Sequence, residues 1–465
     1  MKILLFGTGD YYNRCKKWFE NQEVLALLDN SEQKQYTMID GLKVLPPAEG
    51  VVLKYDIIVI LSFYVEQMKR QLISLGVKPE KIYHFYDLHQ LLAPSAIRRT
   101  VQYFLDAREV VESGKSEESK VLLLSHDLTM GGPAIALFHA AIVLRNRGFK
   151  VVFASMMDGP LLKELMRHEI PVIVDENLQI ATMQEIGWID TFSLLICNTL
   201  NFYVFLSERD TRIPVVWWLH DARFFYDGVN RDVIGKICRQ NLTIVSVGPI
   251  PADAIKEFLP DIICKTLLYG VADTVYGLPA KRKGDKLCFI TIGFLENIKG
   301  QDVLVDAIQR LPDQVRNRCV FYIVGHDQTL FGERIRKESA GIIDVMFTGI
   351  VERYELHRML EDADVLICPS RQDSMPTVAA EAMMHSVPCI ISDVTGTAEY
   401  IHDERDGIIF PAGDAQALAG KIEWCVDNMI QLENMGKQAR KLYERYFSMS
   451  VFEERLMQVV SGAIQ

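Results

Sequence analysis

Short apolar runs alternate with longer stretches of mixed polarity along most of the chain. Such runs, rich in Val, Ile and Leu, are typical of strands buried on both faces of a sheet, and the stretches between them can hold helices. The predicted strands are residues 2–6, 24–29, 56–61, 81–85, 120–125, 150–154, 194–198, 214–219, 243–247, 287–293, 320–325, 345–351, 364–369 and 388–393. This alternation predicts an α/β protein built from βαβ units.

The same pattern divides the chain, whose 465 residues are enough for about three domains. Residues 1–93 form a first, small α/β unit. Residues 94–119 are polar and charged, and we interpret them as a helical linker. Larger α/β units are expected at 120–275 and 276–446, ahead of a final helical segment at about 447–465.

Charge and hydropathy limit the partners that the chain is expected to have. The formal net charge of −11 argues against nucleic acid as the main partner. Arg98, Arg99 and Arg108 of the linker could meet anionic lipid, although a solvated helix face is the simpler interpretation. No apolar run approaches the ~18 residues of a membrane span. Met1–Phe6 leads straight into Gly7-Thr-Gly9, so we expect a first strand there and not a signal peptide.

The nine cysteines are scattered along the chain and include no Cys-x-x-Cys pair. We interpret them as reduced core residues of a cytoplasmic protein, with no metal site implied.

The stretch from Pro369 to Ile401 carries the clearest candidate chemistry. It runs from the end of one predicted strand, through a loop and a helix at 376–385, to the strand at 388–393. Ser374 is expected to cap the helix, and Pro376 suits its first turn. In open α/β sheets a loop at the carboxyl end of a strand is where ligands bind. The free N–H groups and the dipole at the helix start would suit a phosphate.

Two carboxylates bracket this helix start. Asp373 lies just before the helix, and Glu381 lies one turn beyond Thr377 on the same face. One acid can therefore reach a sugar hydroxyl while the other holds a ribose, with a diphosphate between them. On this segment alone, a solvated helix with surface acids is the simpler interpretation.

The spacing Asp373-x7-Glu381-Ala382-Met383 resembles the signature of the family-4 retaining glycosyltransferases, whose first acid is commonly Glu. Lys299-Gly-Gln-Asp302, directly after a predicted strand, resembles a second marker of that family. The resemblance covers about 120–465. It implies the GT-B fold of two facing Rossmann-like domains, the acceptor-side domain at 120–275 and the donor domain at 276–446, with the C-terminal helix crossing back.

The resemblance also implies roles for individual residues. Lys299 would neutralise the donor phosphates and stabilise the departing nucleoside diphosphate. His220, from the end of the strand at 214–219, and Asp373 would face the transferred sugar, so these three are the catalytic candidates. The candidate donor-binding residues are Gly131, Gly132, Arg371, Ser374, Met375, Pro376, Thr377, Glu381, Gly349, Ile350 and Val351. Arg371 could partly replace an arginine that many relatives have where this chain has Phe294. No cofactor and no metal is expected.

The first unit resembles the small Rossmann-like domains attached to bacterial polysaccharide-biosynthesis enzymes. Gly7, Gly9 and Asp29 could form an accessory nucleotide site, because glycines admit a phosphate and an acid after the second strand can bind ribose. The glycine motif is incomplete, since Tyr12 occupies the place of its third glycine. A packing or regulatory role is the favoured interpretation.

Together these patterns predict a retaining glycosyltransferase that uses a nucleotide-diphosphate sugar, UDP-linked, in bacterial surface polysaccharide synthesis. The expected acceptor is a glycan or a lipid-linked glycan, with peripheral contact at the inner membrane face. An alternative is a non-catalytic glycosyltransferase-like subunit that steadies a catalytic partner. A nucleotide-sugar epimerase on the same fold is a weaker third alternative. Turnover of a nucleotide sugar, with product analysis, separates all three.

Overall fold

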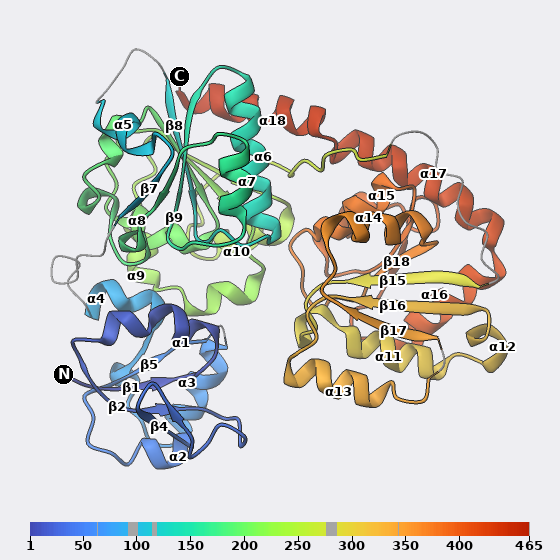
Figure 1. Cartoon of the computed structure of the whole chain (residues 1–465), viewed down its shortest axis with the longest axis horizontal. Helices are drawn as coiled ribbons and strands as arrows, with labels where there is room; N and C mark the ends of the chain where they lie inside the picture. Colours follow the sequence, from blue (N-terminus) through green and yellow to red (C-terminus); the bar gives the residue numbers. More distant parts are fainter. Residues whose placement is uncertain (63, 92–100, 114–118, 276–285, 343, 465) are drawn as a thin grey trace.

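The computed structural model describes residues 1–62, 64–91, 101–113, 119–275, 286–342 and 344–464, which form three α/β units (Figure 1). Each unit is organised around one sheet, and nearly all neighbouring strands are parallel. The prediction of an α/β protein with a small unit ahead of two larger ones is confirmed.

The N-terminal unit has the strand order β3-β4-β2-β1-β5-β6. Its strands are β1 (Lys2–Phe6), β2 (Glu23–Leu28), β3 (Met38–Ile39), β4 (Leu42–Leu45), β5 (Ile57–Ile60) and β6 (Ile82–His84), and its helices are α1 (Asp10–Cys15), α2 (Pro47–Gly50), α3 (Val65–Ser74) and α4 (Leu88–Leu91). Helix α1 is short, because the chain tightens into a 3₁₀ turn at Lys16–Phe19. The antiparallel β3–β4 hairpin was not predicted.

The second unit has the strand order β14-β13-β12-β11-β8-β9-β10-β7. Its strands are β7 (Gln102–Phe104), β8 (Lys120–Ser125), β9 (Lys150–Ser155), β10 (Val172–Val174), β11 (Leu194–Asn198), β12 (Val215–Leu219), β13 (Leu242–Ser246) and β14 (Cys264–Thr266). Its helices are α5 (Ala107–Glu112), α6 (Gly132–Asn146), α7 (Leu161–Arg167), α8 (Tyr203–Ser207), α9 (Arg231–Gly235) and α10 (Pro249–Lys256).

The interval expected to be a helical linker contributes to this second unit. Its strand β7 pairs antiparallel with β10 at the edge of the sheet, and α5 follows. Arg108 stacks over the ring of Tyr103 at 4.7 Å, so this basic residue packs on its own segment. Arg98 and Arg99 lie outside the described residues. The linker prediction is therefore wrong for residues 102–112.

The third unit has the strand order β17-β16-β15-β18-β19-β20, with parallel pairing throughout. Its strands are β15 (Leu287–Ile292), β16 (Cys319–Val324), β17 (Val345–Gly349), β18 (Val365–Cys368), β19 (Cys389–Ser392) and β20 (Ile408–Phe410). Its helices are α11 (Gln301–Arg310), α12 (Asp313–Arg316), α13 (Leu330–Glu338), α14 (Arg353–Asp362), α15 (Thr377–Met384), α16 (Ala415–Asp427) and α17 (Met429–Tyr446).

The last helix, α18 (Met449–Ile464), crosses back to the second unit (Figure 1). There the ring of Phe452 stacks on Trp218 of β12, with ring centroids 5.8 Å apart. At the crossing, the backbone N–H of Val271 donates to the Phe447 carbonyl at 2.8 Å, and the Tyr443 hydroxyl donates to the Val271 carbonyl at 2.9 Å. The two passages of the chain between these units are therefore bound to each other.

A continuous apolar core joins the N-terminal unit to the second unit. Trp18, only 1% exposed, belongs to this core, and its indole N–H donates to Gln179 Oε1 at 3.1 Å. Lys17 forms an ion pair with Glu176 beside it. Burying an indole side chain removes a large apolar area from water. The N-terminal unit is therefore docked on the second unit and not held by a linker alone.

Within the described residues, every helix falls short of the length and apolarity that crossing a bilayer requires.

Candidate active site

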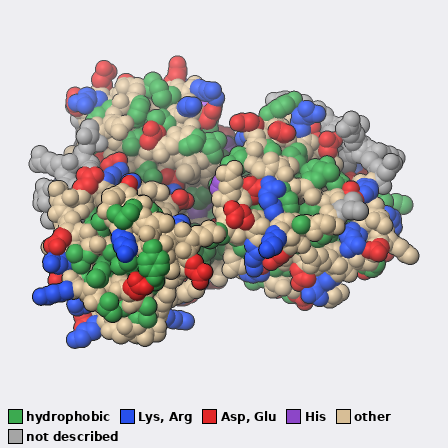
Figure 2. Space-filling model, turned by 60° about the horizontal axis from the view of Figure 1, so that its bottom comes forward, with side chains coloured by type: hydrophobic (Ala, Val, Ile, Leu, Met, Phe, Trp, Pro, Cys, Tyr) green, Lys and Arg blue, Asp and Glu red, His purple; other side chains and the backbone are tan. Residues whose placement is uncertain are grey.

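A cavity of about 680 Å³ lies where the three units meet. Figure 2 shows a hollow between the two halves of the molecule, with charged and histidine side chains at its edges. Its lining includes many of the predicted site residues, namely Gly132, His220, Lys299, Arg371, Asp373, Ser374, Met375, Pro376 and Thr377. Residues brought together from distant parts of the sequence thus share one cavity.

On the side of the third unit, the cavity floor is the loop from β18 to the start of α15. Ser374 does not cap α15, contrary to prediction: the capping position is Pro376, and the buried Ser374 Oγ has no hydrogen-bond partner among the described residues. The loop packs tightly, since a Cβ on Gly396 would lie 1.8 Å from the Ser374 carbonyl oxygen. The backbone N–H groups that begin α15 are therefore presented to the cavity by a firmly packed loop.

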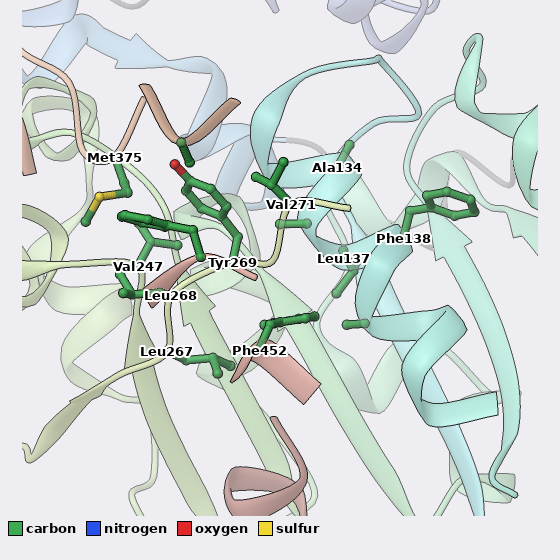
Figure 3. Packing of buried hydrophobic residues seen from close by; sticks show 14 of the residues in the cluster. Ala134, Leu137, Phe138, Val247, Leu267, Leu268, Tyr269, Val271, Met375 and Phe452 are labelled. Carbon is green, nitrogen blue, oxygen red and sulfur yellow. The ribbon is translucent and has the colours of Figure 1, made fainter. Parts of the chain in front are cut away.

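Two contacts from the second unit hold this loop from the opposite side. The Tyr269 hydroxyl donates to the Pro376 carbonyl at 3.1 Å. Met375 lies beside Val247 and Tyr269 in the apolar cluster that joins the two units (Figure 3). Thr397 donates a hydrogen bond to the Met375 sulfur at 3.2 Å. The helix start is therefore fixed from both walls.

The start of α6 faces the start of α15 across the cavity. Gly131 is the capping position of α6, and a Cβ on Gly132 would lie 3.4 Å from Thr377 Cγ2. Because both helices present N–H groups and the positive ends of their dipoles here, the gap between them suits an anion. This is the position predicted for the donor phosphates.

Lys299 and Asp373 form an ion pair in the cavity, with Nζ 2.7 Å from Oδ2. Burial lowers the pKa of Lys299, but the charge and hydrogen bond of Asp373 outweigh burial and raise it, so the ammonium stays charged. Gly300 lets the lysine turn pack here, because it has φ +69° and a Cβ would lie 2.0 Å from the Pro369 carbonyl oxygen. The predicted catalytic cation is thus placed beside the predicted sugar-binding acid.

Glu381 lies on α15, one turn beyond Thr377, and is buried. Its Oε1 accepts a hydrogen bond from Arg353 at 2.7 Å, beside a small cavity of about 40 Å³ that shares Gly132 and Thr377 with the larger one. Burial raises the pKa of Glu381, and the charge of Arg353 partly offsets this rise. Arg353 was not predicted as a site residue, because no local motif marks a contact between residues 28 positions apart.

Arg371 lines the cavity, but its guanidinium is already bound. It donates to both carboxylate oxygens of Asp302, at 2.7 and 2.9 Å, and to the Asn297 carbonyl. Asp302 of the Lys299-Gly-Gln-Asp302 marker therefore positions Arg371. Phe294, which stands where many relatives are expected to have arginine, is 62% exposed.

His220 lies in the cavity at the end of β12 and is buried. Its Nε2 has no hydrogen-bond partner among the described residues. Burial, together with the nearby charge of His126, lowers the pKa of His220 to about 3. The imidazole is therefore neutral at physiological pH and can exchange a hydrogen bond with a bound molecule. The adjacent Asp221 accepts the Leu200 N–H at 2.6 Å and so has a structural contact of its own.

The remaining predicted site residues lie outside this cavity. Gly349 ends β17, Ile350 and Val351 follow it, and Ile350 is 74% exposed. In the N-terminal unit, Asp29 accepts hydrogen bonds from the Thr8 N–H at 3.0 Å and from the Ser31 N–H at 2.9 Å. These contacts hold the Gly7–Gly9 turn to β2, which gives Asp29 a structural role. An accessory nucleotide site at Gly7, Gly9 and Asp29 stays a prediction.

The N-terminal unit also reaches the main cavity, which the sequence analysis did not foresee. Its contributions are Tyr64, Val65, Glu66 and Gln67, from the start of α3 and the residue before it. Residues 224 and 225 of the second unit and Glu296 of the third line the same region. No local motif marks these residues, since only the docking of the units brings them together.

Comparison with known proteins agrees with this geometry. Residues 117–241 match the model of glycosyl-transferase family 4, and residues 279–442 match that of glycosyl transferases group 1. Residues 1–83 match a model described as C2185-like, N-terminal.

Among curated relatives, spore coat protein SA of Bacillus subtilis is 24% identical over 293 residues, which are 57% of this chain and 76% of that protein. D-inositol 3-phosphate glycosyltransferase of Jonesia denitrificans is 28% identical over 171 residues, 35% of this chain and 40% of that protein. The putative colanic acid biosynthesis glycosyltransferase WcaL of Escherichia coli is 27% identical over 195 residues, 40% of this chain and 47% of that protein. The last two matches span less than half of the relative.

Solved structures show the same fold. HepE of Anabaena, in complex with UDP and glucose, has a TM-score of 0.63 at 17% identity, covering 74% of this chain and 100% of that chain. Sucrose-phosphate synthase of Thermosynechococcus elongatus has a TM-score of 0.60 at 17% identity, covering 74% and 99%. The matched models and the fold define a GT-B protein with two facing Rossmann-like units. The chain belongs to the family-4 glycosyltransferases and has an additional N-terminal α/β unit.

Proposed function

We infer that the chain transfers a sugar from a nucleotide-diphosphate donor, UDP-linked, to a glycan or lipid-linked acceptor, with retention of anomeric configuration. The observation that carries this proposal is the cavity in which Lys299 and Asp373 pair beside the facing starts of α6 and α15. The similarity to WcaL, a putative colanic acid biosynthesis glycosyltransferase, and to HepE, whose structure was solved with UDP and glucose, favours surface polysaccharide synthesis and a UDP-sugar. In this proposal the chain acts in the cytoplasm, at the inner membrane face when the acceptor is lipid-linked.

The proposed roles follow the order of groups along the cavity. Glu381 binds the ribose, and the N–H groups at Gly132 and Thr377 bind the diphosphate. Lys299 stabilises the negative charge that develops on the departing nucleoside diphosphate. Asp373 binds a hydroxyl of the transferred sugar, and the neutral His220 donates or accepts one hydrogen bond at the same sugar. The acceptor hydroxyl attacks from the face that the diphosphate leaves, and a diphosphate oxygen takes its proton.

Helix N–H groups and a lysine supply the positive charge in this scheme, so we propose that transfer needs no metal ion. Activity that persists in excess chelator is the expected result, and activity lost to chelator and restored by a divalent cation would contradict it.

The experiment that tests the proposal compares full-length wild-type protein with Lys299→Ala on UDP-, GDP- and ADP-linked sugars. The release of nucleoside diphosphate at saturating donor is measured, and the anomeric configuration of the product is read by NMR. Lys299→Ala should lose about 2–4 kcal/mol of transition-state stabilisation, a slowing of roughly 30- to 900-fold.

Lys286→Ala is the matched control, because Lys286 also pairs with an aspartate, Asp344, in the third unit but does not line the cavity. It should turn over at the wild-type rate. Wild-type turnover in Lys299→Ala would contradict the assigned role. A wild-type protein that binds a nucleotide and a partner subunit but releases no sugar would favour the non-catalytic alternative, to which the exposed Phe294 gives some support.

A further inference from the structure

The N-terminal unit supplies part of the cavity wall beyond the paired Lys299 and Asp373. Tyr64 precedes α3 and is 57% exposed, and Glu66 lies in the first turn of that helix. Both line the cavity that holds the Lys299–Asp373 pair. Glu296 of the third unit lines the same cavity, so Tyr64 and the third unit border one opening. The wall is thus formed by a unit that a two-domain GT-B protein does not have.

The position of this wall separates it from the groups proposed for the donor. Glu381 and Arg353 line the small cavity, which adjoins the large one at Gly132 and Thr377. Tyr64 and Glu66 line the large cavity but not the small one. Lys299 and Asp373, where transfer is proposed, also line the large cavity and not the small one. A molecule against Tyr64 would therefore approach the reacting sugar from the side away from the nucleoside.

The wall combines aromatic rings with carboxylates. Phe224 and Phe225, with ring centroids 4.0 Å apart, line it together with Tyr64. Aromatic rings give large, rigid apolar contact area, which suits the C–H face of a sugar ring. Glu66, Asp227 and Glu296 add carboxylates that accept hydrogen bonds from hydroxyl groups. Asp227 is paired with Arg223 at 2.9 Å. The surplus of negative charge disfavours a phosphate or an acidic sugar at this place.

Docking of the N-terminal unit on the second unit fixes the part of the wall that these two units contribute. Trp18 is buried against the second unit and bonds to Gln179, and Asn230 donates to Asp87 Oδ1 at 3.4 Å. A wall fixed in this way can select a ligand, because little ordering of the protein accompanies binding.

We propose that the N-terminal unit completes the acceptor subsite, with Tyr64 as the packing surface for an uncharged sugar ring and Glu66 as a hydroxyl-binding carboxylate that excludes anionic sugars. This proposal rests on the proposed glycosyltransferase function. It gives the additional unit a role in acceptor selection, in place of packing or regulation.

The test uses full-length protein with UDP present and the methyl glycosides of glucose, galactose, N-acetylglucosamine and glucuronic acid as probes. Saturation-transfer NMR measures their apparent affinities for the wild-type, Tyr64→Ala and Tyr36→Ala proteins. Tyr36 is the matched control, since it belongs to the same unit and is equally exposed at 57%, but does not line the cavity. Tyr64→Ala should bind the neutral glycosides about threefold to tenfold more weakly, whereas Tyr36→Ala should match the wild type.

A second variant tests the charge argument by a gain of binding. Glu66→Lys should bind the glucuronide more strongly than the wild-type protein does, because it replaces a repulsive charge with an attractive one. Wild-type protein that binds none of the neutral glycosides, or equal binding by wild type and Tyr64→Ala, would overturn the proposal. So would a wild type that prefers the glucuronide.

Acceptor-independent release of UDP from a UDP-sugar separates this proposal from the function on which it rests. The wild-type protein and the control Tyr36→Ala should release UDP in water at the same rate, because Tyr36 does not line the cavity. If the wild type neither binds UDP nor releases it, the proposed transfer fails. A loss of glycoside binding in Tyr64→Ala would even then support a neutral-sugar subsite.

Discussion

Glu381 is a buried carboxylate whose ion-pair partner within the described residues is the half-exposed Arg353. It lies in the second turn of α15 and is buried. Arg353, at the start of α14, donates a hydrogen bond to it. Burial of an ionised carboxylate is costly unless it is paired and hydrogen-bonded. Arg353 therefore serves the fold as well as the proposed ribose site.

Arg353→Ala should reduce the free energy of unfolding at pH 7 by about 1–3 kcal/mol, because it leaves a buried carboxylate unsatisfied. How this loss of stability varies with pH follows from the pKa of Glu381. Burial raises that pKa, and Arg353 partly lowers it. Without Arg353, the pKa of Glu381 in the folded protein rises further above its value in the unfolded chain, about 4.3. The loss in the free energy of unfolding caused by Arg353→Ala should thus be absent below about pH 4, where Glu381 is protonated. It should grow as the pH rises through the pKa of Glu381 in the folded protein. Urea unfolding at several pH values measures it.

Arg334→Ala is a suitable control, because Arg334 has similar exposure, 52%, and its ion pairs within the described part of the chain are longer, at 3.7 and 3.8 Å. Its guanidinium also stacks over the ring of Phe331 at 5.0 Å. It should change stability by less than about 0.5 kcal/mol. Glu381→Gln in the Arg353→Ala background should remove the pH dependence. A deficit that stays constant with pH would show that lost packing, and not the carboxylate, is responsible.

Site residues that directly follow predicted strands could be identified from the sequence alone. Lys299 and Asp373 follow predicted strands of the third unit, and the ends of parallel strands meet at one edge of a sheet, so their convergence could be expected. His220 follows a strand of the second unit, and it joins them because the two units face each other across the cavity. Tyr64 and Arg353 could not be found in that way, because their contacts depend on how separate segments dock. The predicted cap Ser374 failed for a packing reason, since the loop buries its side chain two residues before Pro376.

At the scale of elements, α6 and α15 begin on opposite sides of the cavity with their first residues in near contact. Gly132 is the first residue of α6, and its missing side chain keeps the gap to Thr377 open. A helix position of this kind tolerates alanine without backbone strain, because alanine is the best helix former.

Gly132→Ala should therefore leave stability unchanged or slightly higher while weakening UDP binding about tenfold, or 1.4 kcal/mol. The new methyl group would lie 3.4 Å from Thr377 Cγ2, in the space proposed for the diphosphate. Calorimetric titration with UDP measures the change. Gly420→Ala, in α16 with open space around its Cβ, should bind UDP like the wild type. Unchanged UDP affinity in Gly132→Ala would place the diphosphate elsewhere.

The long buried strands were predictable because every residue in them is apolar, as in β5 and β12. The short strands β7 and β14 were missed, since both are partly exposed and lie at sheet edges, where sequence constraints are weak. β17 ends at Gly349, two residues before the predicted end, where the backbone turns to φ +69°.

At the scale of the whole molecule, the N-terminal and second units share a core and should unfold together. Trp18→Ala should lower the free energy of unfolding by about 3–5 kcal/mol, because it removes a fully buried aromatic side chain. In scanning calorimetry, a single transition of these two units should shift to lower temperature. Separate transitions for residues 1–91 and for the second unit would show that the docking contributes little.

Trp424→Ala is the comparison, because Trp424 packs against the core of the third unit alone. It should shift the transition of the third unit and leave that of the docked pair in place. Equal effects of the two tryptophan variants on all transitions would indicate one cooperative molecule.

The hydrogen bond between Val271 and Phe447 joins the two passages of the chain between the second and third units. A rotation of one unit relative to the other would therefore have a single pivot at this place. In such a rotation, the displacement of a residue grows with its distance from the pivot. The N-terminal unit lies at the opposite end of the cleft from the crossing (Figure 1). A rotation about this pivot would thus move Tyr64 relative to Glu296 more than it moves Tyr269 relative to Pro376. The entrance beside the N-terminal unit is therefore the part of the cavity whose width depends most on the angle between the two units.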